Sequence, residues 1–87
     1  MTQALKYFKK AVLYKGDSNS DKINIAGTHL NICVIYSHMS NHKTGLAHAY
    51  MALEILESCN VKHSDMAYLS SLVLTHYNIG VEYEKLG

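Results

Sequence analysis

The chain contains no proline and no arginine, and only five of its 87 residues are glycine. Because proline and glycine are the residues that most disfavour a helix, their scarcity leaves long stretches in which a helix can continue. Charged residues are also few, at 17% against the usual quarter, and the formal net charge is +1. This balance argues against a nucleic-acid-binding surface and against a trap for acidic ligands. The length allows one small domain.

Cysteines and long apolar runs are scarce as well. Cys33 and Cys59 both lie among apolar residues, which predicts two reduced thiols in a cytosolic compartment and no disulfide framework. No uninterrupted apolar run approaches 18 residues, so a membrane span is not expected. Lysines interrupt the stretch that follows Met1, and a signal peptide is not expected either.

Apolar residues recur at helical spacing nearly everywhere along the chain. The pattern predicts four helices, over residues 2–15, 22–39, 44–59 and 65–86. The breaks between them are short and polar, which places consecutive helices antiparallel. No segment shows the alternation that a strand would need.

Polar residues near the breaks indicate where each helix begins or ends. The expected C-cap of the first helix is Gly16. For the next three helices the candidate N-caps are Ser20 or Asp21, then Ser40, Asn41 or Thr44, and finally Ser64. Gly80 lies inside the last helix, where it costs about 1 kcal/mol relative to alanine. We therefore expect a neighbouring helix to approach closely at Gly80.

One phrase occurs twice. "HLNICVIY" at residues 29–36 returns as "HYNIGVEY" at residues 76–83, with an offset of 47 residues. A small residue, Cys33 or Gly80, stands three positions before Tyr36 or Tyr83. Small residues at these places let two helices pack closely, and the two tyrosines are expected in the core or between helices.

A second phrase alternates with the first. "ALKYFKKA" places Ala4, Phe8 and Ala11 at spacings of four and three, and "GLAHAYMA" repeats these spacings with Gly45, Ala49 and Ala52. Two types of helix therefore alternate along the chain. A repeated helical hairpin explains this order.

These phrases resemble the tetratricopeptide repeat family. The resemblance implies an all-α fold of about four helices, in which antiparallel hairpins stack as a right-handed α-solenoid. It divides a single domain, residues 1–87, into a second-helix half-repeat (2–15), a full hairpin (22–59) and a first-helix half-repeat (65–87). The spacings of 41 and 47 residues exceed the common period of about 34. They are closer to kinesin-light-chain-like arrays, and a plain four-helix bundle is the alternative.

The resemblance also implies a function and a site. In this family the first helices line a concave groove, and an asparagine in each hydrogen-bonds the backbone of an extended peptide. Asn31 and Asn78 occupy that place here, and the other groove candidates on the same helices are Val34, His38, Val81 and Lys85. The alternative interpretation has each asparagine bonded to a neighbouring helix or to water. The basic clamp of chaperone-binding members is not expected, since it needs Lys and Arg at positions that this chain does not match.

No other chemistry is predicted. The acidic residues form no recognisable nucleophile motif with a His or Cys, and the six histidines lack paired zinc-ligand spacing. We therefore expect no catalytic residue, no metal and no cofactor.

The order of helix types bears on the partners. A terminal helix of either type lacks its sequence partner, which would leave Leu72, Ile79 and Tyr83 half covered. The expected partners are an extended peptide or protein, and a neighbouring repeat unit, a second copy or a larger complex at the open ends. The primary interpretation is a cytoplasmic interaction module. The second is a structural subunit of a large cytoskeletal or ciliary assembly.

Overall fold

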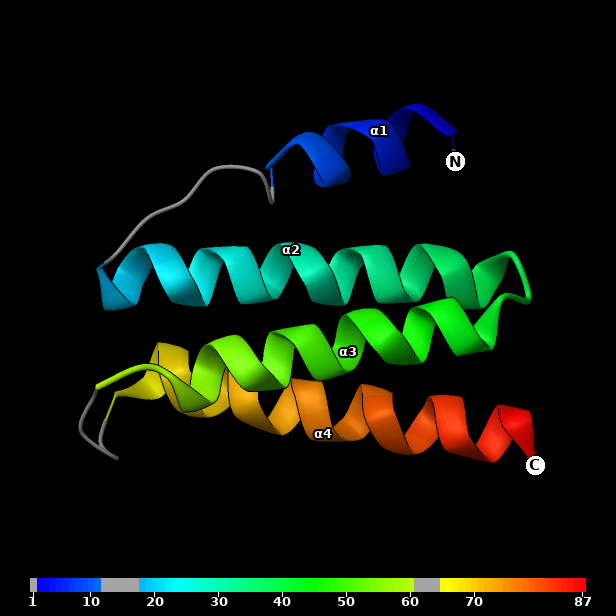
Figure 1. Ribbon diagram of the computed structural model, residues 1–87. Coiled ribbons are helices and arrows are strands. Elements are labelled where there is room, and N and C mark those ends of the chain that lie inside the picture. The colour runs from blue at the N-terminus through cyan, green and yellow to red at the C-terminus, as the bar shows by residue number, and fades with distance from the viewer. Residues whose placement is uncertain (1, 12–17, 61–64) are drawn as a thin grey trace.

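The computed structural model describes residues 2–11, 18–60 and 65–87. Within these ranges the chain folds into four helices: α1 (Thr2–Ala11), α2 (Asn19–His38), α3 (His42–Glu57) and α4 (Met66–Leu86). Helix α2 packs against the other three, and α3 also packs against α4 (Figure 1). The described part of the chain is therefore a small all-α globule, as the sequence predicts.

The N-caps differ in part from those expected. Ser18 caps α2, because its side chain accepts a hydrogen bond from the backbone N–H of Asp21 at 3.0 Å. The expectation of Ser20 or Asp21 was wrong, since both lie within the first helical turn. Asp65 caps α4 by accepting from the N–H of Tyr68 at 3.0 Å, in place of the expected Ser64, which lies outside the described residues.

Asn41, one of the three candidates for α3, is confirmed as its N-cap, with the Thr44 N–H 3.4 Å from its side-chain oxygen. Each of the three N-cap side chains, of Ser18, Asn41 and Asp65, accepts a hydrogen bond from a backbone N–H that has no partner within the helix. Residues 12–15 of the first predicted helix and its expected C-cap Gly16 lie outside the described ranges.

The core lies between α2 and α3. Ala26 and Leu30 of α2 form a buried cluster with Ala52 and Leu56 of α3. Ile23, Ile55, Tyr68 and Leu72 pack around this cluster, so that α4 closes one side of it. Burying apolar side chains in this way is the main favourable contribution to folding.

Helices α2 and α3 approach each other closely at Gly45. A Cβ added there would lie 3.1 Å from the backbone oxygen of Cys33. Gly80 differs, because a Cβ there would meet nothing within 4 Å and the residue is exposed. The prediction of close approach at Gly80 is therefore wrong within the described structure.

The tyrosines that end the two copies of the repeated motif also differ in exposure. Tyr36 is half-buried, whereas Tyr83 is 51% exposed. Tyr83 still packs between helices, since its ring meets that of Tyr50 edge-on at 6.3 Å and their hydroxyls are 2.7 Å apart. Leu72 and Ile79 are half-buried, and with Tyr83 they confirm the half-covered surface expected on the last helix.

Candidate functional site

The predicted groove residues on α2 form an exposed stripe. Asn31, Val34 and His38 follow one another at spacings of three and four, so they lie along one side of the helix. All three are exposed, and Val34 has 40% of its surface accessible although it is apolar. These side chains are open to a partner.

The matching residues on α4 are less open. Asn78 and Val81 are half-buried, and Lys85 is exposed. The Asn78 amide donates to the backbone oxygen of Leu74 at 2.9 Å, one turn back on its own helix. Its second N–H and its side-chain oxygen take no part in that bond. Because α2 and α4 contact each other directly, the two asparagines belong to adjacent helices.

A buried polar junction joins three helices, and the sequence did not reveal it. Glu82 of α4 is 1% exposed, and its Oε2 lies 2.6 Å from Nδ1 of His42 in α3. Ser37 Oγ of α2 lies 3.4 Å from the same nitrogen, and the Cys33 thiol donates to Glu82 Oε1 at 4.0 Å. An acidic residue therefore meets both a His and a Cys in the folded chain, in contacts that no sequence motif indicates.

The junction holds helices together and is poorly suited to covalent chemistry. Burial, and then the Glu82 carboxylate, raises the pKa of the Cys33 thiol to about 11. The thiol therefore stays protonated at neutral pH, and a protonated thiol is a poor nucleophile. One feature of the sequence indicates the junction. At the offset of 47 residues that relates the two motifs, the charged Glu82 takes the place of the apolar Ile35, which is buried in α2.

A second cluster joins α1, α2 and α3. Nδ1 of His29 lies 3.0 Å from Nδ1 of His48, so one ring donates and the other accepts. Tyr36 stacks on His48 with ring centres 5.7 Å apart, and Lys9 Nζ of α1 lies 5.4 Å from the centre of the Tyr36 ring.

Both histidines of this cluster favour the neutral form. Burial lowers the pKa of His29, and the neighbouring His48 lowers it further. Burial also lowers the pKa of His48, with a smaller contribution from Lys9. A shared hydrogen bond between two imidazoles requires that at least one nitrogen be unprotonated, which agrees with these directions.

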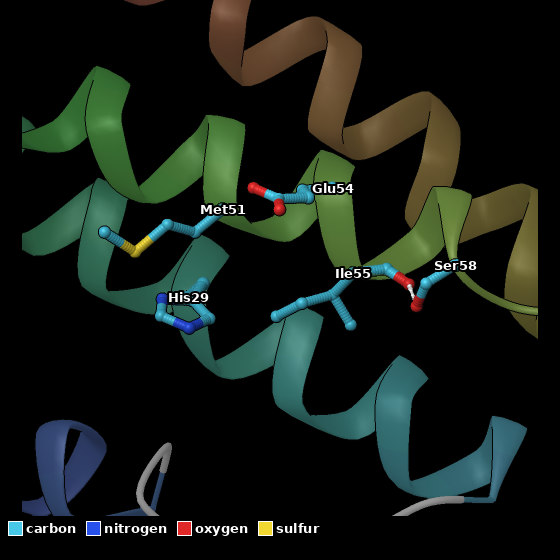
Figure 2. A pocket seen from close by; sticks show the side chains of 5 residues that line it. All are labelled: His29, Met51, Glu54, Ile55 and Ser58. Carbon is cyan, nitrogen blue, oxygen red and sulfur yellow. Dashed lines mark hydrogen bonds between the residues drawn. The ribbon is translucent and has the colours of Figure 1, made fainter.

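Shallow hollows open on the surface of the described residues. One, of about 340 Å³, lies between α2 and α3. In Figure 2 the Met51 side chain extends over His29, and the Ser58 hydroxyl donates to the Ile55 backbone oxygen at 2.6 Å. Another, of about 470 Å³, lies on α4 and is mainly apolar, lined by Met66, Leu69, Ser70, Val73 and Leu74.

Residues 2–11, 18–60 and 65–87 contain neither a metal-binding cluster nor a membrane-spanning helix. In these ranges no three His, Cys, Asp or Glu side chains are grouped so that they could hold a metal ion. No described helix combines the length and the apolar character needed to cross a bilayer. Cys33 and Cys59 are free thiols.

Comparison with known proteins returned no match to a protein-family model, a curated protein or a solved structure. The resemblance to tetratricopeptide repeats therefore depends on the two alternating phrases. The functional proposal below therefore uses the contacts and the exposure of the residues in these repeated motifs.

Proposed function

We propose that this chain is a non-catalytic protein-interaction module of the tetratricopeptide repeat type. In this proposal α2 and α4 are first helices, α1 and α3 are second helices, and the hairpins stack as a right-handed α-solenoid. The module binds an extended peptide along the stripes that contain Asn31 and Asn78. The observation that carries the proposal is the exposed stripe of Asn31, Val34 and His38 on α2. This helix is adjacent to α4, which contains the second copy of the same motif.

Equivalent contacts between helices support the stacking. Lys9 of α1 lies over Tyr36 of α2, and Tyr50 of α3 contacts Tyr83 of α4. Lys9 and Tyr50 hold the same place in "ALKYFKKA" and "GLAHAYMA", and the two tyrosines hold the same place in the other phrase. A contact that recurs between matched positions is what a repeat array requires.

The stripe on α2 has the chemistry of a peptide site. An asparagine carboxamide can both donate to and accept from a peptide group, and Val34 offers apolar surface beside it. From Asn31 to His38 the helix rises about 10 Å, enough for roughly three residues of an extended peptide.

The test is a selection of peptides on the intact chain. We expect the wild-type protein to enrich specific sequences from a display library of random peptides of about twelve residues. Substituting both Asn31→Ala and Asn78→Ala should weaken binding of an enriched peptide at least about tenfold, since each lost hydrogen bond costs about 1 kcal/mol. Titration calorimetry measures this change.

Asn60→Ala is the matched control, because Asn60 is an exposed carboxamide outside the helices. Circular dichroism verifies that all variants keep the wild-type helix content. Enrichment of no sequence, or equal affinity for the double variant, would refute the peptide-groove proposal.

A second candidate function is a structural subunit of a large cytoskeletal or ciliary assembly. It is favoured by the exposed apolar side chains on α4, where Met66 is 71%, Val73 70% and Tyr77 67% accessible. An assembly subunit should precipitate or unfold when expressed alone and should recover when its partners are co-expressed. A peptide-binding module should remain folded alone in the cytoplasm.

A further inference from the structure

The exposed apolar side of α4 corresponds to the side of α2 that α3 covers. We call its residues the open face: Val73, His76, Tyr77, Gly80 and Tyr83. With the offset of 47 residues, they match Ala26, His29, Leu30, Cys33 and Tyr36 of α2. Every residue of the open face is exposed, whereas the first four of their counterparts are buried and Tyr36 is half-buried. The same pattern thus occurs once covered and once uncovered.

The contacts of α2 show what its covered side binds. The backbone oxygen of Cys33 faces Gly45, and the rings of His29 and Tyr36 both stack against His48. Ala26 and Leu30 pack with small and apolar side chains further along α3. The covering helix therefore supplies a small residue, a ring three positions later, and a second small residue, Ala52, seven positions after the first.

Helix α1 has the same order of residues as α3. Ala4 takes the place of Gly45, Tyr7 that of His48, and Ala11 that of Ala52. Ala4 is exposed, and Tyr7 is 70% accessible. The chain thus contains both the open face and a helix of the type that covers such a face.

We propose that the open face of α4 binds α1 of a second copy of this chain. The pairing reproduces the α2–α3 contact, with Ala4 of the second copy over Gly80 and its Tyr7 against His76 and Tyr83. Tyr83 then receives two contacts, from Tyr50 on one side and from Tyr7 on the other. Tyr36 already has both, from Lys9 and from His48.

Charge agrees with this occupant. Residues 66–81 of α4 contain no Asp, Glu, Lys or Arg, so α1 approaches without like-charge repulsion. The exposed Glu84 matches Ser37, which contacts the first residue of α3, so Glu84 lies at the first turn of the incoming α1. That turn contains no acidic residue of its own, and a carboxylate there is favourable beside the helix N-terminus.

This pairing joins the head of one copy to the tail of the next. Such a contact is heterologous, so copies add in series unless the rotation between them closes a ring. It uses the outer side of α4 and α1, and it does not depend on the peptide groove.

The test uses two variants of the full 87-residue chain, each blocked at one end. The head variant is Tyr7→Glu, with Ala4→Lys as a second form, and the tail variant combines Val73→Glu with Tyr77→Ser. Sedimentation equilibrium from about 10 μM to 1 mM measures mass. We expect wild-type mass to rise with concentration beyond a dimer, each variant alone to stay monomeric, and their equimolar mixture to form a one-to-one heterodimer.

Met51→Ser is the matched control, because it removes a side chain of 44% exposure from α3 without touching the open face, and it should associate as the wild type does. Circular dichroism confirms the fold of each variant. A wild-type chain that is monomeric at 1 mM would overturn the proposal. So would a head variant that still dimerises, which would indicate α4–α4 pairing, or a mixture that remains monomeric.

Discussion

Helices α2 and α4 contain the same phrase but have different surroundings. Helix α2 lies between α1, α3 and α4, and six of its residues are buried. Helix α4 packs against α2 and α3, and its two buried residues are the polar Thr75 and Glu82. The comparison shows that a periodic pattern sets which side of a helix can be buried, while the neighbouring helices decide whether it is.

The two helices also differ on their inner side. Where α2 buries the apolar Ile35, α4 buries Glu82. The carboxylate is tolerated because His42 and the Cys33 thiol meet it, and Thr75 is satisfied by donating to the Ser71 backbone oxygen at 2.7 Å. The buried side-chain N and O atoms of the described residues all have partners. At this position α4 is thus held by polar bonds, whereas α2 is held by apolar packing.

The largest effect is expected from breaking the polar attachment of α4. His42→Ala leaves the buried Glu82 carboxylate without its closest partner, which should cost about 3 kcal/mol of unfolding free energy. Replacing both residues by apolar ones, Glu82→Ile with His42→Leu, should return stability to within about 1 kcal/mol of wild type. Urea denaturation at low micromolar concentration measures both. A cost below about 1 kcal/mol for the single variant would contradict this account of the junction.

A matched pair of alanine substitutions compares the covered side of α2 directly with the open face of α4. Leu30→Ala removes a side chain that is 3% exposed in the core, and should cost about 2.5 kcal/mol. Tyr77 stands at the position of α4 that matches Leu30, and 67% of its surface is exposed. Tyr77→Ala should therefore change stability by less than about 0.5 kcal/mol. Chemical denaturation of the monomer gives both values, and equal costs would mean that the open face is covered within a single chain.

Alanine substitutions at Gly45 and Gly80 compare the covered and the open side again, with smaller expected changes in unfolding free energy. Alanine favours a helix over glycine by about 1 kcal/mol. At Gly80, where a Cβ meets nothing, Gly80→Ala should raise the unfolding free energy by up to that amount. At Gly45 the Cβ would press on the Cys33 backbone oxygen, so Gly45→Ala should lower stability by about 1 kcal/mol. Thermal denaturation should shift the two midpoints in opposite directions.

The smallest effect concerns pH. Because the pKa values of His29 and His48 are lowered in the folded state, the unfolded chain binds more protons as pH falls below about 6.5. Stability should therefore be constant above pH 7 and decrease as the pH falls below about 6.5. Urea midpoints at pH 7.5, 6.0 and 5.0 test this. His48→Gln should flatten the dependence, and an unchanged slope would exclude this pair as its source.

The fold class could be predicted from the sequence because apolar spacing and the short polar breaks depend on local residues. The four helices, the Asn41 cap and the half-covered last helix all follow from such patterns. The register of Glu82 could have indicated a buried carboxylate, but its partners could not be predicted, since the junction combines positions 33, 37, 42 and 82 on three helices. Gly80 misled the prediction because a glycine indicates that a helix can approach, not that one does.

The proposed groove remains a prediction for a related reason. Exposure of Asn31, Val34 and His38 shows that α2 can accept a ligand there, but no local pattern encodes the ligand. The hydrogen bond of Asn78 to its own helix is also invisible in the sequence, because an asparagine at that register could equally project outward.

The protonated Cys33 thiol gives the molecule a built-in reporter of its own opening. It is fully buried between α2, α3 and α4, while Cys59 is half-buried near the end of α3. An aqueous thiol reagent should therefore label the chain in two phases, with Cys33 reacting only when the three helices separate. The rate of the slow phase gives the frequency of that separation in the native state. It can be followed in the unmodified sequence, without any introduced probe.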